Sequence, residues 1–167
     1  MNEIRIFISS STVEFERERQ YLGNFIRSLD NFFKQWGVRL ELAICEDLSQ
    51  TIQRTRMQET YNQKIRQSHF HYVLVGRDVG AYVLEEFEVG LANFQKTGFP
   101  KICTWFQTPP EGEEDSASVA AFKARIEEID HYYHMYEHLD TIKLSMLFEL
   151  LRFCADADML AFLKKTT

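Results

Sequence analysis

The feature that most constrains the fold is a regular alternation between short apolar runs and longer segments with helical periodicity. Four runs are nearly continuous in β-branched and aromatic residues, which is typical of buried strands. A strand that is apolar on both sides needs a covering layer on both sides, as in a parallel sheet between helices. The alternation therefore predicts an α/β fold: a flavodoxin-like, doubly wound parallel sheet of four to five strands with helices on both faces, plus C-terminal helices. The four runs are residues 4–9, 38–45, 71–76 and 101–106.

Helical patterns fill the intervals between these runs. Residues 11–14 (Ser-Thr-Val-Glu) match a capping box, and a long amphipathic helix follows them and stops at Gly37. A polar helix is predicted over residues 57–67, and a third helix ends near Gly98. Beyond the fourth run we expect a helix, a short edge strand and a second helix near residues 119–133, 135–139 and 141–163.

Length and composition favour one domain. The chain has 167 residues, of which 45% are hydrophobic and 14% aromatic, so it can bury one substantial core. We expect a single domain over residues 1–167, with its core in residues 4–106 and a C-terminal helical part over residues 116–165. Residues 108–118, which include two prolines and four acidic residues, are the clearest flexible loop.

Charge and cysteine usage narrow the partners and the compartment. The net charge of −6 opposes binding to nucleic acid or to an anionic membrane surface. No apolar stretch approaches the roughly 18 residues of a membrane span, and no N-terminal signal is visible. The three widely spaced cysteines, Cys45, Cys103 and Cys154, fit a reduced chain. We therefore expect a cytoplasmic protein.

Ligands of parallel α/β sheets bind beyond the carboxyl ends of the strands, which narrows the search to four loops. The first loop carries Ser9, Ser10 and Ser11, whose hydroxyls stand with backbone N–H groups at an expected helix N-terminus and suit a phosphate. In the alternative structural interpretation, Ser11 or Thr12 only caps the helix. The loops are residues 9–12, 46–56, 76–86 and 106–110; they contain no P-loop and no G-x-G-x-x-G, which argues against ATPase and Rossmann dehydrogenase chemistry.

Charged and metal-ligating residues leave further alternatives open. Glu85, Glu86 and Glu88 open the helix after the third strand, where the helix dipole stabilises acidic side chains, although one of them can instead face a ligand. Arg54 and Arg56 suit either phosphate or a solvated loop. Three histidines follow helical spacing without a second ligand cluster, so no metal site is predicted; they are His131, His134 and His138.

The order of several motifs resembles that of TIR (Toll/interleukin-1 receptor) domains over about residues 4–106. Residues 6–10 (Ile-Phe-Ile-Ser-Ser) resemble the first TIR strand, and Ser68 stands ahead of the third strand. Residues 82–87 (Tyr-Val-Leu-Glu-Glu-Phe) resemble the TIR motif W-x-x-x-E-L, with Tyr in place of Trp. The Glu18–Arg19 pair and the start of the chain are similar to a TIR-like group of bacterial and eukaryotic multidomain proteins.

This resemblance implies an NAD+ nucleosidase that releases nicotinamide and either ADP-ribose or a cyclic isomer, in bacterial antiphage or innate immune signalling. It implies that Glu86 is the catalytic residue and Tyr82 the aromatic ligand contact, while Ser9 and Ser10 line the ribose-diphosphate side. NAD+ is then the substrate and no cofactor is required. The resemblance also implies self-association through TIR–TIR contacts and, with the C-terminal helices, a downstream effector or sensor domain.

Two other functions remain open. The glycine or proline usual in the second TIR loop is missing between residues 46 and 56, which favours a non-catalytic TIR-like interaction module. Residues 88–92 (Glu-Val-Gly-Leu-Ala) resemble the E-x-G-x-A stretch of nucleoside 2-deoxyribosyltransferases, in which Glu88 would be the nucleophile on a related N-glycosidic bond.

Overall fold

The computed structural model describes residues 2–11, 14–44 and 54–157, with the backbone alone for residues 54–57. One sheet of five strands has the order β2-β1-β3-β4-β5, and every neighbouring pair is parallel. This is the flavodoxin-like order, whose switch point lies between β1 and β3. The predicted fold class is confirmed. The strands are β1 (Asn2–Ser10), β2 (Val38–Ile44), β3 (Phe70–Val75), β4 (Lys101–Gln107) and β5 (Tyr133–Tyr136).

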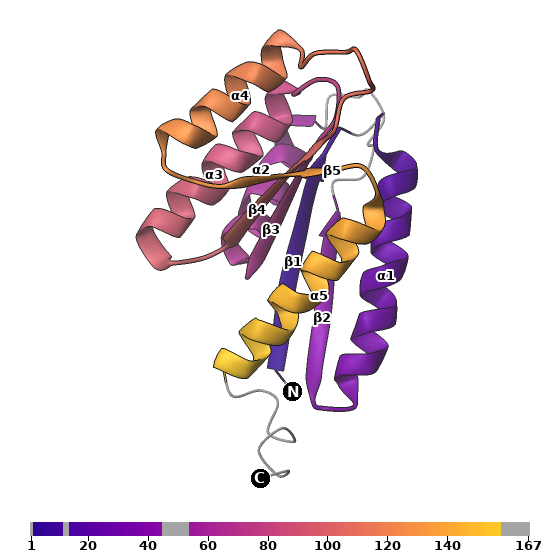
Figure 1. Cartoon of the computed structure of the whole chain (residues 1–167). Coiled ribbons are helices and arrows are strands. Elements are labelled where there is room, and N and C mark those ends of the chain that lie inside the picture. The colour runs from indigo at the N-terminus through magenta and orange to yellow at the C-terminus, as the bar shows by residue number, and fades with distance from the viewer. Residues whose placement is uncertain (1, 12–13, 45–53, 158–167) are drawn as a thin grey trace.

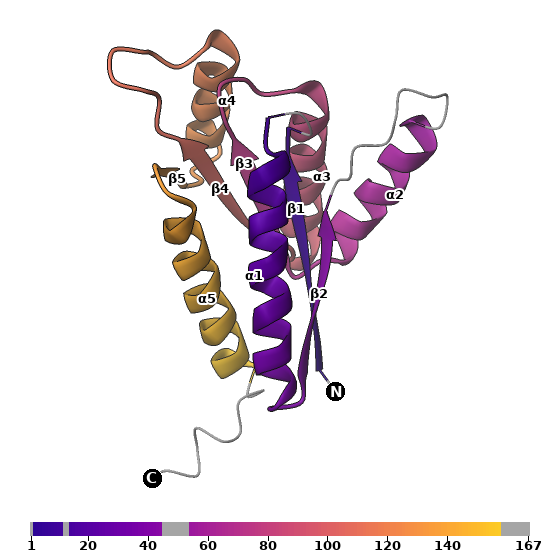
Figure 2. The same ribbon diagram turned by 90° about the vertical axis from the view of Figure 1, so that its right-hand side faces the viewer.

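Helices cover both faces of the sheet (Figures 1 and 2). Alternate residues of a strand point to opposite faces, and in β1 Ile4, Ile6 and Ile8 join the core under α1 and α5, whereas Phe7 packs against α2. On the face of the sheet that α2 covers, a further core joins β3 and β4 to α3 and α4. The helices are α1 (Glu16–Lys34), α2 (Arg54–Gln67), α3 (Ala81–Thr97), α4 (Ala117–Glu128) and α5 (Leu139–Asp156).

The predicted end of α3 is confirmed, because Gly98 caps the helix with a φ of 79°, a left-handed conformation that glycine adopts without steric cost. α1 ends slightly before the predicted Gly37, at Lys34, and Gly37, with a φ of 74°, turns the chain into β2. α1 begins at Glu16, later than predicted, but the predicted capping contact of Ser11 is present, because the Glu14 N–H donates to the Ser11 hydroxyl at 3.4 Å. The expected polar loop lies mostly outside the described residues, and α2 begins at Arg54 rather than at residue 57.

The C-terminal third differs most from the sequence-based expectation. The prediction of a helix over residues 119–133 is wrong beyond Glu128, because Asp130 takes a left-handed φ of 54° and turns the chain into β5. The short edge strand is confirmed, although it begins two residues earlier than expected. α5 packs its buried face into the same core as β1 and β3, and residues 158–163 of the predicted helix lie outside the described part.

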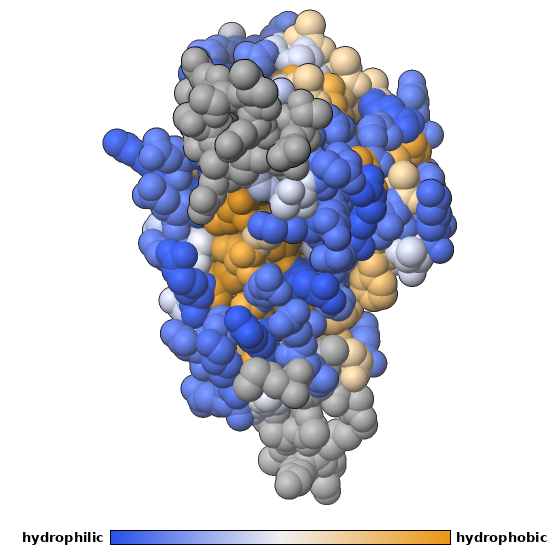
Figure 3. All heavy atoms as spheres, turned by 180° about the vertical axis from the view of Figure 1, so that it is seen from behind, coloured by the Kyte–Doolittle hydropathy of each residue, from blue (hydrophilic) through white to orange (hydrophobic). Residues whose placement is uncertain are grey.

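The surface is largely polar, with an apolar strip visible when the molecule is seen from behind (Figure 3). None of the described helices is long and apolar enough to cross a membrane. Cys103 and Cys154 are free thiols, and Cys45 lies outside the described residues. Burial raises the pKa of the Cys103 thiol to about 12, so this thiol stays protonated.

Candidate active site at the carboxyl edge of the sheet

The three carboxylates of α3 do not open the helix. α3 begins at Ala81 after Gly80, which is extended, and its first turn contains no acidic residue. Glu85, Glu86 and Glu88 therefore lie in the second turn and beyond, where the helix dipole no longer stabilises them strongly. The expectation that they open the helix is wrong, so the helix dipole does not explain why three carboxylates lie on this part of α3.

These three carboxylates face three directions. Glu85 accepts a hydrogen bond from Asn62 Nδ2 of α2 at 2.8 Å. Glu88 is paired with Arg125 of α4, whose Nε lies 3.0 Å from Oε1 and whose second terminal nitrogen lies 3.2 Å from Oε2. Glu86 is only 1% exposed and lies on the inner side of α3. Glutamates are almost never enclosed to this degree unless they are paired or functional, so Glu86 is the distinctive carboxylate of the helix.

The contact between Gly90 and His71 fixes the position of Glu86 along the direction of the strands. A Cβ on Gly90 would lie 2.6 Å from Nδ1 of His71, so α3 and β3 touch at this level. Glu86 is one helical turn earlier, about 6 Å nearer the carboxyl edge. Two strand residues cover about the same distance, which brings Glu86 level with Val73. Since Val73 pairs with Ser9 across the sheet, Glu86 stands over the carboxyl ends of β1 and β3.

Ser9 and His71 form a buried polar pair next to this position. Ser9 Oγ lies 2.6 Å from His71 Nε2, and both residues are fully buried. Burial lowers the pKa of His71 to about 3, so its imidazole is neutral at physiological pH. Sequence analysis missed His71. The available signal was one titratable side chain within the apolar run of residues 70–75, which is buried along its whole length.

The first loop does not present its serines to one ligand. Ser10 points to the opposite face from Ser9, where Arg19 donates to its hydroxyl at 3.5 Å. Arg19 also donates to the Ser11 carbonyl at 2.7 Å, and the Ser11 hydroxyl accepts from the Glu14 N–H at 3.4 Å. The structure therefore brings Ser9 toward α3 and Glu86, and places Ser10 and Ser11 on the α1 side.

Tyr82 lies one turn before Glu86 on α3 and is 50% exposed. Residues four apart on a helix are neighbours on its surface, so the aromatic ring stands at the solvent end of the same side. Arg54 and Arg56 begin α2, and their side chains lie outside the described part of the chain.

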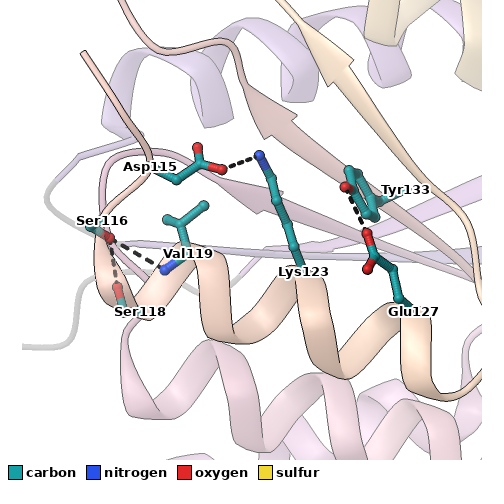
Figure 4. A network of polar contacts seen from close by, with 7 residues as sticks. All are labelled: Asp115, Ser116, Ser118, Val119, Lys123, Glu127 and Tyr133. Carbon is teal, nitrogen blue, oxygen red and sulfur yellow. Dashed lines mark hydrogen bonds and ion pairs between the residues drawn. The ribbon is translucent and has the colours of Figure 1, made fainter.

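A hollow of about 290 Å³ opens beyond the carboxyl ends of β3 and β4. Its outer wall is the loop before α4, and a network of polar contacts holds that loop (Figure 4). Lys123 binds Asp115 at 2.5 Å, and Ser116 accepts from the Val119 N–H at 3.3 Å as the N-cap of α4. The lining of the hollow contains Arg77 and several carboxylates but not Glu86.

The three spaced histidines do not share a helix. His131 follows α4, and His138 precedes α5. His134 belongs to β5 and stacks on Trp105 of the neighbouring strand β4. Across the described residues, no group of three or more histidines, cysteines or carboxylates is placed to hold a metal ion.

Known proteins resemble this chain in structure and not in sequence. No protein-family model matches the sequence, and no curated protein matches it. The structure is similar to the CMP N-glycosidase BcmB of Clostridium botulinum, with a TM-score of 0.51 and 12% identity over 86% of this chain and 98% of that chain. It is also similar to the RPS4 and RRS1 TIR domain heterodimer, with a TM-score of 0.47 and 12% identity over 93% and 97%. At these identities the likeness concerns the fold alone.

Proposed function

We propose that this chain is a TIR-type N-glycosidase that cleaves the nicotinamide–ribose bond of NAD+. The observation that carries the proposal is the enclosed Glu86 carboxylate above the carboxyl ends of β1 and β3. Ligands of this fold bind at that edge of the sheet. The resemblance of residues 82–87 to the TIR motif names the same residue from the sequence.

The chemistry needs one fixed carboxylate. When the bond between C1′ and the nicotinamide nitrogen breaks, its electron pair leaves with nicotinamide, and C1′ becomes an oxocarbenium-like centre. A carboxylate placed beside C1′ stabilises this positive charge or captures it covalently. Water then adds to C1′ and releases its proton to give ADP-ribose; an adenine nitrogen that adds instead gives a cyclic isomer. The low exposure of Glu86 strengthens its electrostatic effect, because little water screens the carboxylate.

Tyr82 supports the same assignment. Its half-exposed ring one turn from Glu86 is suited to stack on a flat nicotinamide or adenine ring. Ser9, on the same face of the sheet as α3, provides a hydroxyl at the level of Glu86. We assign Ser9 to the ribose side of the site and Tyr82 to its solvent end.

A second candidate is an N-glycosidase that acts on a nucleoside monophosphate. The fold likeness to a CMP N-glycosidase favours it, as does the resemblance of residues 88–92 to deoxyribosyltransferases. Both candidates cleave an N-glycosidic bond and differ in substrate and carboxylate. Glu88 is 48% exposed and is held by Arg125 on the α4 side, so we assign the reaction to Glu86.

The test is to incubate the concentrated protein with NAD+ or CMP, with and without a crowding agent that promotes self-association. Released nicotinamide and cytosine are measured by chromatography. We expect nicotinamide from NAD+. Cytosine from CMP alone would favour the second candidate. If neither base is released, the non-catalytic interaction module becomes the better account.

A further inference from the structure

The imidazole of His71 is fully buried among Ser9, Phe7 and Gly90. Ser9 Oγ lies 2.6 Å from Nε2, and the ring of Phe7 packs edge-on with its centroid 5.6 Å away. On the helix side, a Cβ on Gly90 would lie 2.6 Å from Nδ1. The ring therefore has one orientation, with Nε2 toward Ser9 and Nδ1 toward α3.

This orientation determines which ring nitrogen carries the proton. Nδ1 is buried and has no hydrogen-bond partner among the described residues. A buried N–H without an acceptor is rarer and more costly than a lone pair without a donor. Since burial keeps the ring neutral, it has a single proton, and this proton belongs on Nε2.

The proton on Nε2 defines the role of Ser9. His71 Nε2–H donates to Ser9 Oγ, so the Ser9 hydroxyl cannot use that contact for its own proton. Ser9 then donates its proton to an acceptor elsewhere, and its side chain lies on the α3 face, level with Glu86. The opposite tautomer would turn the Ser9 proton toward His71 and leave Ser9 only able to accept.

We propose that His71 is a positioning residue, whose Nε2–H holds the Ser9 hydroxyl as a hydrogen-bond donor directed to the Glu86 side of the sheet. This inference rests on the proposed N-glycosidase function, because it assigns Ser9 and His71 to that site. It adds to the site a residue that never contacts the substrate but acts through Ser9.

The first test measures the tautomer in the wild-type protein by nitrogen-15 NMR at neutral pH. We expect His71 to carry its proton on Nε2 and to show an unprotonated Nδ1. His69 is the internal reference, because its Nδ1 accepts the Arg5 N–H at 2.9 Å and its proton must therefore be on Nε2. A proton on Nδ1 of His71 overturns the proposal.

The second test compares His71→Gln with His71→Leu in nicotinamide release. The Gln amide can still donate to Ser9, whereas Leu cannot, so we expect kcat to fall about tenfold or more in His71→Leu with little change in KM. His71→Gln should retain most of kcat, and His69→Gln, which precedes β3 and packs against Phe153 of α5 on the other face of the sheet, should match the wild type.

Gly90→Ala tests the contact between α3 and His71 as a whole, because the same contact also sets the position of Glu86. The new methyl group would displace the His71 ring without changing its chemistry, so kcat should fall as in His71→Leu. Circular dichroism of each variant shows whether it folds, and the NMR measurement on the wild type decides the tautomer even where a variant does not.

The outcomes separate the two proposals. Wild-type kcat in a folded His71→Leu variant overturns the positioning role and leaves the proposed function intact. Absence of nicotinamide release from the wild type contradicts the proposed function, and a proton on Nε2 would then still support the Ser9–His71 hydrogen bond.

Discussion

The Glu14 carboxylate lies against the backbone of Gly76 and accepts a hydrogen bond from the Arg77 N–H at 2.7 Å. Glu14 follows β1 and Gly76 follows β3, so this contact joins the carboxyl ends of the two strands that flank the switch point. A Cβ on Gly76 would overlap the carboxylate, which explains a glycine at this position. The contact holds together the edge on which the candidate site is built.

Replacing Glu14 should loosen this edge. We expect Glu14→Ala to lower the free energy of unfolding by about 1 kcal/mol, because the Arg77 N–H loses its acceptor. Gly76→Ala should have a similar effect, since its methyl group displaces the same carboxylate. Urea unfolding of the single variants and of the double variant measures the coupling.

The double-variant cycle is the control for this prediction. If both changes act through one contact, the double variant loses little more than the more destabilised single variant. Glu14→Gln keeps an acceptor oxygen and should be less destabilised than Glu14→Ala. Fully additive losses would show that Gly76 and Glu14 stabilise the fold independently.

The burial of His71 makes stability depend on pH. Its pKa is lowered to about 3 in the folded protein, against about 6.5 when unfolded, so the unfolded chain binds the extra proton between these values. The contribution of neutral His71 is present above pH 6.5 and is lost as the pH falls toward 3, at up to about 1.4 kcal/mol per pH unit.

Urea unfolding of the wild type and of His71→Gln at several pH values between about 7 and 4 measures this term. The difference between the two slopes isolates His71, because the other titrating groups are common to both proteins. Parallel slopes would mean that His71 is not buried as a neutral ring.

Ser116 provides the side-chain cap of α4. Its hydroxyl accepts from the Val119 N–H at 3.3 Å, so Ser116→Ala should lower the free energy of unfolding by about 1 kcal/mol. Ser116→Asn retains a capping oxygen and should be nearly as stable as the wild type. Equal stability of all three proteins in thermal unfolding would contradict the assigned role.

Glu88 should be dispensable for catalysis. Its carboxylate is paired with Arg125 between α3 and α4, with both side chains more than 40% exposed, and such pairs contribute little to stability. Glu88→Gln should therefore release nicotinamide at the wild-type rate and show a small, salt-sensitive change in thermal stability. Loss of turnover in this variant would move the catalytic role to Glu88.

Much of the fold was predictable because strands and helices leave local patterns. The four apolar runs match β1 to β4 within a few residues, and Gly98 marks the end of α3. The end of α4 was not predictable in the same way, because it depends on Asp130 in a left-handed conformation that aspartate adopts only in some contexts.

The site was predictable only in part, because its geometry depends on contacts between distant segments. The position of Glu86 beyond β3 follows from the chain order, whereas its enclosure requires the packing of α3 on β1 and β3. The opposite orientations of Ser9 and Ser10 follow from strand alternation once β1 extends to Ser10. The Ser9–His71 bond joins residues 62 positions apart, and no local pattern indicates it.

The most direct measurement of the central claim is the initial rate of nicotinamide release from NAD+ by the wild type, Glu86→Gln and Glu88→Gln at equal, high concentration. Glu86→Gln keeps the shape of the side chain and removes its charge. The account predicts release by the wild type and Glu88→Gln, and a loss of at least about a hundredfold in Glu86→Gln. Wild-type release by a folded Glu86→Gln protein would contradict it.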